Sequence, residues 1–278
     1  MTTPPACGRN RSVITILFYG DLVGRPGRDS VERHIREKRD ALRPDIIIAN
    51  GENSSGGIGL EPQTAEELFG IGIDVLTAGN HIWQKKDIGP YLDANQHRIV
   101  RPANFPPGAP GVGSLSFKTK AGPAIKVANL MGRVFMPQII DCPFRSVDDI
   151  LSSHAKERSG GAQLSFIDFH AEATSEKLAF GFHVDGRATA VVGTHTHVQT
   201  ADERLLPKGT AYISDVGMCG ARNSVIGFKQ ELVVERFITA RPARFEVEKG
   251  ELIVNAVCIR CDEGTGSVVK IERIVEIY

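Results

Sequence analysis

The sequence has few cysteines, few aromatic residues and no long hydrophobic stretch. Its 278 residues include five scattered cysteines, an odd number that argues against a disulfide framework and favours a reducing compartment. No apolar run is long enough to cross a bilayer. The apolar residues 13–19 are too few for a secretory signal and precede no small-residue cleavage site. We therefore expect a cytoplasmic protein with no membrane attachment and a disordered leader over residues 1–12.

The sequence also lacks a charge imbalance. Its 33 basic residues match its 33 acidic residues, and neither sign forms a long run. An extended nucleic-acid surface needs a basic stripe, so this class of partner is excluded, although a small nucleotide is not. With 41% hydrophobic and 24% charged residues, the composition is typical of a globular protein that buries a sizeable core.

Short β-branched runs alternate with segments of helical character. The predicted strands are residues 13–19, 45–49, 74–77, 163–168 and 188–192, and the predicted helices are residues 29–42, 62–70, 85–92, 146–154 and 172–183. This alternation indicates βαβ units. From residue 211 onward the pattern becomes strand-rich, with predicted strands at 244–247, 252–260 and 268–277. We expect a layered α/β fold of mixed sheets flanked by helices. Because no linker interrupts the chain, we expect residues 13–278 to form a single domain.

Polar side chains occur where the predicted strands end. They are Asp21, Glu52, Asn80, His170 and His195. In open α/β folds, ligand sites form at the carboxyl ends of strands, so these side chains are expected to converge. Carboxylates, amide oxygens and imidazoles suit manganese, iron, zinc or cobalt. No cysteine belongs to the set, which argues against a structural zinc site.

Each of these residues also has a structural interpretation. Asp21 stands close to a helix start, where carboxylates often act only as caps, and Asn80 is a common turn former. His195 and His197 are two apart in an extended segment, so they would share one side and could be buried, hydrogen-bonded residues. That all these positions fall at strand ends by chance is much less probable than any single structural role.

The ordered motifs carry a family resemblance. They are Gly20-Asp21, Gly51-Glu52-Asn53, Gly79-Asn80-His81, His170 and Gly193-Thr194-His195-Thr196-His197. Together they resemble the YmdB-like family of bacterial phosphodiesterases, within the calcineurin-like metallophosphoesterase superfamily. The superfamily's usual Asp-x-His motif is absent at Asp21, and its usual bridging aspartate is replaced by Glu52. Both departures are typical of the narrower family.

This resemblance implies a layered calcineurin-like fold, a homo-oligomer and a dinuclear metal site holding iron or manganese, with zinc or cobalt as alternatives. It implies one set of ligands for the first metal, namely Asp21, Glu52, Asn53 and His197. It implies a second set, namely Glu52, Asn80, His170 and His195, so that Glu52 bridges the two ions. His81 is implied as the proton donor. The implied substrate is a 2′,3′-cyclic nucleotide, opened to the 3′-nucleotide.

The mechanism that follows is metal-dependent phosphodiester hydrolysis by a hydroxide held between two ions. A phosphomonoesterase or nuclease could use the same site, and a non-catalytic metal-dependent regulatory protein is a third interpretation. Arg25 and Arg28 are expected in a loop after Asp21, either as phosphate ligands or as surface residues near a helix start. Trp83 could stack on a base or pack in the core. Asp168 is interpreted as an acceptor that orients His170, or as a strand end.

Overall fold

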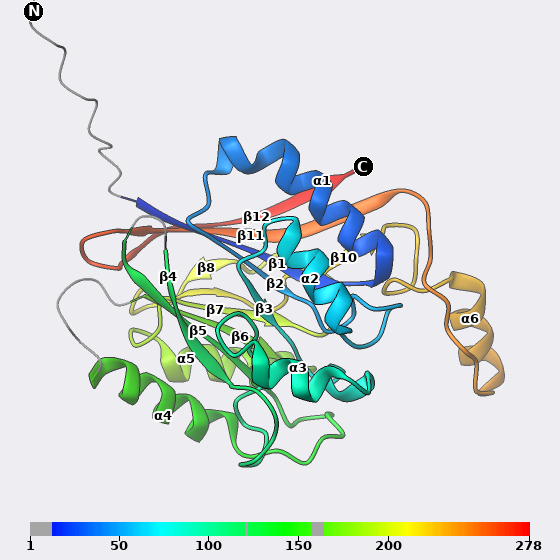
Figure 1. The fold of residues 1–278 in the computed structure, drawn as a ribbon, viewed down its shortest axis with the longest axis horizontal. Coiled ribbons are helices and arrows are strands. Elements are labelled where there is room, and N and C mark those ends of the chain that lie inside the picture. The colour runs from blue at the N-terminus through cyan, green and yellow to red at the C-terminus, as the bar shows by residue number, and fades with distance from the viewer. Residues whose placement is uncertain (1–12, 120–121, 157–163) are drawn as a thin grey trace, which may run out of the picture.

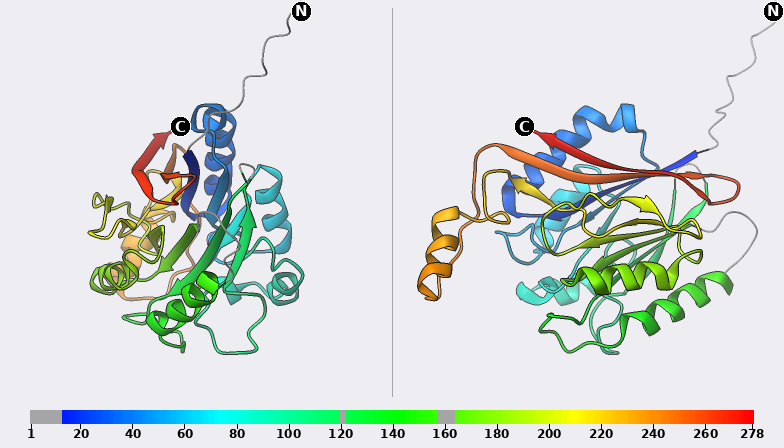
Figure 2. Two further views of the ribbon diagram at one scale, coloured as in Figure 1. Left: turned by 90° about the vertical axis from the view of Figure 1, so that its left-hand side faces the viewer. Right: turned by 180° about the vertical axis from the view of Figure 1, so that it is seen from behind.

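Two β-sheets stacked face to face form the centre of the molecule, with helices on both outer faces (Figures 1 and 2). This computed structural model describes residues 13–119, 122–156 and 164–278. The leader expected over residues 1–12 lies outside the described residues. The layered α/β architecture predicted from the sequence is confirmed.

Each sheet has six strands among the described residues. Across the first sheet lie β12 (Val268–Ile277), β11 (Leu252–Asp262), β10 (Met218–Ala221), β1 (Val13–Leu22), β2 (Ile46–Asn50) and β3 (Val75–Thr77). Across the second lie β4 (Ser114–Lys118), β5 (Ala124–Met131), β6 (Leu164–His170), β7 (Ala190–Thr194), β9 (Ala211–Ile213) and β8 (Arg204–Leu205). The helices are α1 (Gly24–Leu42), α2 (Pro62–Gly70), the 3₁₀ helix η1 (Ile82–Gln84), α3 (Ile88–Ala94), α4 (Pro143–Lys156), α5 (Thr174–Val184) and α6 (Gln230–Thr239).

Side-chain alternation along each strand explains the layers. In β1, Ile16 and Phe18 belong to the core between the two sheets, whereas Leu17 belongs to the core under α1, α2 and α3. Phe18 meets Phe166 of the second sheet at a ring-centroid distance of 5.1 Å. A third core lies under α4 and α5. Because both faces of these strands are buried, their sequences are continuous apolar runs rather than alternating ones.

The strand register aligns the carboxyl ends of neighbouring parallel strands. In the first sheet Asp21 pairs with Asn50, and Asn50 pairs with Thr77. In the second sheet His170 pairs with Thr194. The ends of β1, β2 and β3 thus form one row and the ends of β6 and β7 another. Asp21 and His170 lie in these two rows, and the loops that leave the rows carry the other residues predicted to form the site.

The structure differs from the sequence prediction in three regions. Strands β4 and β5 were not predicted. Helix α1 begins at Gly24 rather than near Asp29, so Arg25 and Arg28 lie in its first turns and not in a loop. The region after residue 211 contains helix α6, and the strand predicted at 244–247 is reduced to an isolated bridge between Phe228 and Val247. Helix α6 contains β-branched residues, which are typical of strands, so its sequence favours a strand. In the described part of the chain, no helix combines the length and apolarity needed to cross a membrane.

Candidate metal centre

Asp21 lies near the carboxyl end of β1 and is completely buried. Its Oδ2 accepts a hydrogen bond from the His195 backbone N–H at 3.0 Å. Its Oδ1 has no hydrogen-bond partner among the described residues. Burial is the largest cause of a raised pKa at this carboxyl, because the charged form loses its solvation. A buried carboxylate oxygen without a donor requires a cation or a proton.

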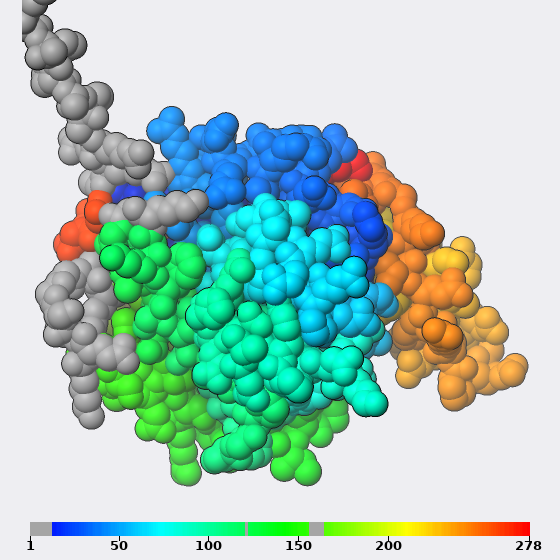
Figure 3. All heavy atoms as spheres, viewed as in Figure 1, coloured from blue at the N-terminus to red at the C-terminus, as the bar shows by residue number. Residues whose placement is uncertain are grey.

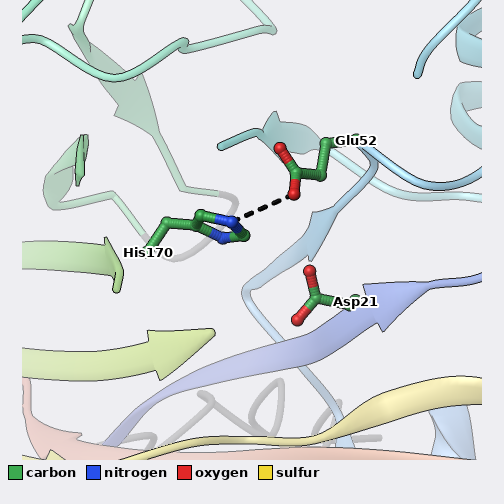
Figure 4. A group of neighbouring side chains, drawn as sticks. All are labelled: Asp21, Glu52 and His170. Carbon is green, nitrogen blue, oxygen red and sulfur yellow. Dashed lines mark ion pairs between the residues drawn. The ribbon is translucent and has the colours of Figure 1, made fainter. Parts of the chain in front are cut away.

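Glu52 lies in the turn that follows β2 and is also completely buried (Figure 4). Its Oε2 accepts a hydrogen bond from the His81 backbone N–H at 2.9 Å. Its Oε1 lies 3.0 Å from His170 Nε2 but accepts no hydrogen bond. Burial raises the pKa of this carboxyl as well. Figure 4 shows the side chains of Glu52, Asp21 and His170 pointing toward one common space.

His170 ends β6 and presents Nε2 to the same space. Its Nδ1 lies 2.9 Å from Thr194 Oγ1, and that hydroxyl donates to Asp168 Oδ1 at 2.7 Å. Thr194 Oγ1 therefore accepts a hydrogen bond from the protonated Nδ1, which leaves the lone pair on His170 Nε2. This Nε2 lies 2.7 Å from Asn80 Oδ1 and 3.1 Å from His195 Nδ1.

The two clustered imidazoles are kept neutral. Burial lowers the pKa of His170 to about 3 and that of His195 to about 2. His195 Nε2 lies 3.1 Å from Glu172 Oε2, so its Nδ1 is the nitrogen left free. Glu172 did not emerge from the sequence, although its position two residues after His170 was a signal that could have identified it. A carboxylate on the distal nitrogen is the usual way in which proteins orient a metal-binding imidazole.

His197 approaches the opposite side of Asp21. Its Nδ1 donates to the Ile226 carbonyl at 3.0 Å, so its Nε2 carries the lone pair. That nitrogen lies 3.8 Å from Asp21 Oδ1 and 3.2 Å from the Asn53 amide. A half-turn of this amide exchanges its nitrogen for its oxygen and would present a second acceptor to the same point.

These groups fit a divalent metal. One donor atom each from Asp21, Glu52 and His170 lies within 4.8 Å of the others, all three being buried. Unpaired carboxylate oxygens beside neutral imidazoles form an electron-rich set of the kind that divalent metal ions bind. Asp21, Glu52 and His170 form the centre of this cluster, and the other four residues expected as ligands, Asn53, Asn80, His195 and His197, each contact one of these three or a neighbouring ligand candidate.

His81 lies beside this cluster. Its Nε2 is 3.3 Å from the Asn80 amide nitrogen, and its Nδ1 is buried without a hydrogen-bond partner in the described chain. Its backbone N–H is fixed by Glu52. The imidazole is therefore placed next to the proposed ligands without joining them.

The other candidates lie differently. Arg28 donates to the Ser54 carbonyl, and its Nε is 3.2 Å from Glu67 Oε1, so its guanidinium is engaged by the protein. Arg25 pairs with Asp29 in a solvent-exposed position. Trp83 packs edge-on against Phe105 at a ring-centroid distance of 5.4 Å and remains partly exposed. The partners of all three side chains are thus residues outside the cluster.

Asp168 is linked to His170 through Thr194, whose hydroxyl accepts from His170 Nδ1 and donates to Asp168 Oδ1. Its carboxylate also accepts hydrogen bonds from Asn50 Nδ2 at 3.1 Å and Thr77 Oγ1 at 2.5 Å, both from the first sheet. Burial raises the pKa of Asp168 to about 7. This single side chain therefore joins the two sheets directly beneath the cluster.

A buried ion pair supports the turn that carries His195 and His197. Lys177 Nζ lies 2.6 Å from Asp215 Oδ2 and donates to the Thr194 carbonyl at 2.8 Å. Asp215 also accepts from the Thr196 N–H at 3.0 Å. His195 and His197 have φ values of 104° and 66°, in a region that residues other than glycine rarely adopt. The ion pair fixes this strained backbone.

Stacked mixed sheets with a buried Asp, Glu and His cluster at their carboxyl ends define a calcineurin-like metallophosphoesterase fold. Comparison with known proteins narrows this class. A family model described as YmdB-like protein matches residues 17–274. The 2′,3′-cyclic-nucleotide 2′-phosphodiesterase of Bacillus subtilis (strain 168) is 48% identical over 94% of this chain and 96% of its own.

Two solved structures agree with this assignment. A hypothetical protein from Thermus thermophilus superposes with a TM-score of 0.86 and 40% identity, covering 95% of this chain and 99% of its own. A phosphatase from Mycoplasma pneumoniae superposes with a TM-score of 0.87 and 36% identity, covering 95% and 94%. The chain belongs to the YmdB-like family, which confirms the resemblance seen in its motifs.

Proposed function

We propose that this protein is a dinuclear metal-dependent phosphodiesterase that opens 2′,3′-cyclic nucleotides to 3′-nucleotides. The observation that carries the proposal is the pair of buried, unpartnered carboxylate oxygens, Asp21 Oδ1 and Glu52 Oε1, beside neutral imidazoles. That the protein is a hydrolase acting on phosphoric diesters follows from its family membership and from its similarity to the Bacillus subtilis phosphodiesterase. The cyclic nucleotide is proposed from the name of that relative.

The contacts support a division of the ligands into two groups. Asn53 and His197 lie on the Asp21 side, and would hold one ion with it. Three other residues converge on His170 Nε2, namely Asn80, His195 and Glu52. Glu52 is proposed to bridge, because its unpartnered Oε1 faces the space that Asp21 and His170 also face (Figure 4). Iron or manganese is proposed for both positions, with zinc or cobalt as alternatives.

Two bound divalent ions would supply Lewis-acid activation of a water nucleophile and neutralise the phosphate oxygens. The protein's own contribution is orientation and proton transfer. The departing ribose oxygen needs a proton, and we assign its delivery to His81, whose imidazole is adjacent to Asn80 but outside the ligand set. The Glu52 contact to the His81 backbone couples the position of this acid to that of the bridging carboxylate.

The test measures hydrolysis of 2′,3′-cAMP, a phosphomonoester and an acyclic diester, with metal analysis of each sample. Cleavage of the cyclic diester with 3′-AMP as product supports the proposal. Preference for the monoester would favour a phosphomonoesterase, preference for the acyclic diester a nuclease, and metal binding without hydrolysis a regulatory protein.

Glu52→Gln removes the bridging charge with little change in shape. We expect it to lower both metal affinity and kcat by at least about a hundredfold, since a metal ligand is lost. Glu246→Gln, which removes an exposed partner of Lys229, is the matched control and should behave like the wild type. An unchanged hydrolytic rate in metal-loaded Glu52→Gln would contradict the bridging assignment.

We also propose that the protein is cytoplasmic and forms a homo-oligomer. Assembly is supported by α6, which stands off from the two-sheet body (Figures 1 and 3). Its Phe237 and Ile238 are 83% and 79% exposed, and exposed apolar clusters often mark association surfaces. Light scattering of the purified protein tests this.

A further inference from the structure

The segment between β5 and α4 contains an unusual aromatic residue. Phe135 is 84% exposed and has a φ of 62°. A bulky side chain in the left-handed region is a genuine outlier, and such strain persists only when the surrounding structure enforces it. The neighbouring Met136 is buried, so the apolar anchor of this turn is Met136 and not Phe135.

The same segment is fixed at both ends to residues of the metal centre. At its start the Gly132 N–H donates to the His170 carbonyl at 2.9 Å. At its end Gln138 Nε2 donates to the Asn80 carbonyl at 3.4 Å. Phe135 is three residues from Gly132 and three from Gln138, so its Cα lies within about 11 Å of the Cα atom of each. The turn that carries Phe135 is therefore tethered on both sides to residues proposed as metal ligands.

The turn between these anchors is also braced. The Glu176 carboxylate accepts hydrogen bonds from the Arg133 N–H at 3.0 Å and the Val134 N–H at 3.1 Å. The Met136 N–H donates to the Arg133 carbonyl at 3.3 Å. Gln138 Oε1 is buried without a hydrogen-bond partner among the described residues, so the segment retains an unused acceptor. An exposed aromatic ring on a strained, firmly braced turn is organised for a ligand rather than for the core.

We propose that Phe135 is the surface on which the nucleobase of the substrate stacks. The inference rests on the proposed function, because only a nucleotide substrate brings a base to this turn. Every base offers a π face, so such a contact strengthens binding without selecting strongly among bases. Phe135 would thus distinguish nucleotides from small cyclic diesters that lack a base, while the metal centre treats the phosphate of both alike.

The experiment compares 2′,3′-cAMP with glycerol 1,2-cyclic phosphate, which has the same five-membered ring but no base. We expect Phe135→Ala to lower kcat/KM for 2′,3′-cAMP about tenfold, as for loss of a base–aromatic stack, and to leave the glycerol ester unchanged. Phe135→Tyr should retain activity. Phe135→Gly, which also relieves the backbone strain, should lose as much as Phe135→Ala. Ile139→Ala, at a 93% exposed position of the same loop, is the control.

An equal fall for both substrates, or no fall, would overturn the proposal. A binding measurement distinguishes failure of the stacking proposal from failure of the proposed phosphodiesterase function. Isothermal titration of metal-loaded protein with 3′-AMP and with glycerol phosphate reports stacking without hydrolysis. If the wild type cleaves no cyclic diester, the proposed function fails, yet selective weakening of 3′-AMP by Phe135→Ala still supports the stacking role. Equal affinities of the wild type and Phe135→Ala for 3′-AMP would exclude it.

Discussion

At the residue scale, the distal nitrogen of each clustered histidine decides which nitrogen can bind a metal. Thr194 accepts from His170 Nδ1, Glu172 faces His195 Nε2, and the Ile226 carbonyl accepts from His197 Nδ1. The free nitrogens are therefore Nε2, Nδ1 and Nε2 respectively. A hydroxyl, a carboxylate and a backbone carbonyl thus perform the same function, which residue type alone would not reveal.

Thr194→Val tests this orienting role. The substitution keeps the shape of the side chain but removes the hydroxyl that accepts from His170 and donates to Asp168. We expect metal affinity to fall about 10- to 100-fold, the usual effect of losing such a contact. Competition with a chromophoric chelator measures it. Thr194→Ser, which retains the hydroxyl, should bind like the wild type, and equal affinity in Thr194→Val would refute the role.

At the element scale, the turn after β7 depends on α5. Lys177 reaches from α5 to the Thr194 carbonyl and to Asp215, and Asp215 holds the Thr196 N–H. Both ion-pair partners are almost completely buried. The left-handed backbone at His195 and His197 is therefore maintained by a contact between distant elements rather than by local sequence.

Lys177→Met leaves the Asp215 carboxylate buried without its cation. We expect the free energy of unfolding to fall by about 3–5 kcal/mol, the effect of breaking a buried pair. Urea denaturation in chelator measures this change. Lys38→Met removes an ion pair with Glu276 whose two side chains are both more than one-third exposed, and it should leave the free energy of unfolding nearly unchanged.

Metal content distinguishes two roles of the Lys177–Asp215 ion pair, namely stabilising the fold and positioning the turn that carries His195 and His197. Folded Lys177→Met should hold less metal than the wild type at equal free ion concentration, because the two histidines lose their geometry. Equal metal content in folded Lys177→Met and wild type would show that the pair stabilises the fold without positioning the site.

The elements that the sequence predicted best are those whose signal is local. Helix α2 has the predicted bounds, Pro62–Gly70, since its proline fits the first helical turn and its apolar residues face the core. Helix α6 was missed because its adjacent β-branched residues favour a strand and little of it is buried. The roles of Thr194 and Glu172 could not be predicted, because they depend on strand register and on loop geometry that no local pattern encodes.

At the scale of the whole molecule, the site lies where the two sheets meet. Asp21, Glu52 and Asn80 end or follow strands of the first sheet, and His170 and His195 end or follow strands of the second. Asp168 already joins the sheets at this point through hydrogen bonds. A bound ion would add a second connection of the same kind, so metal binding and folding stability should be linked.

Metal removal should therefore lower the melting temperature, and the size of the change should depend on pH. At ion concentrations about a thousandfold above Kd, linkage gives about 4 kcal/mol of stabilisation.

Burial raises the pKa of Asp21 and Glu52 in the metal-free protein, so at lower pH the ion must displace protons that the carboxyls hold more firmly. The metal-induced increase in melting temperature should thus be larger at about pH 8 than at about pH 6. Calorimetry of chelated and manganese-loaded protein at both pH values measures it. Asp262→Asn changes the half-buried last residue of β11, which pairs with Val13 at the opposite end of β1 from Asp21, and it should leave this difference unchanged. A metal effect that grows toward acid pH would contradict the linkage.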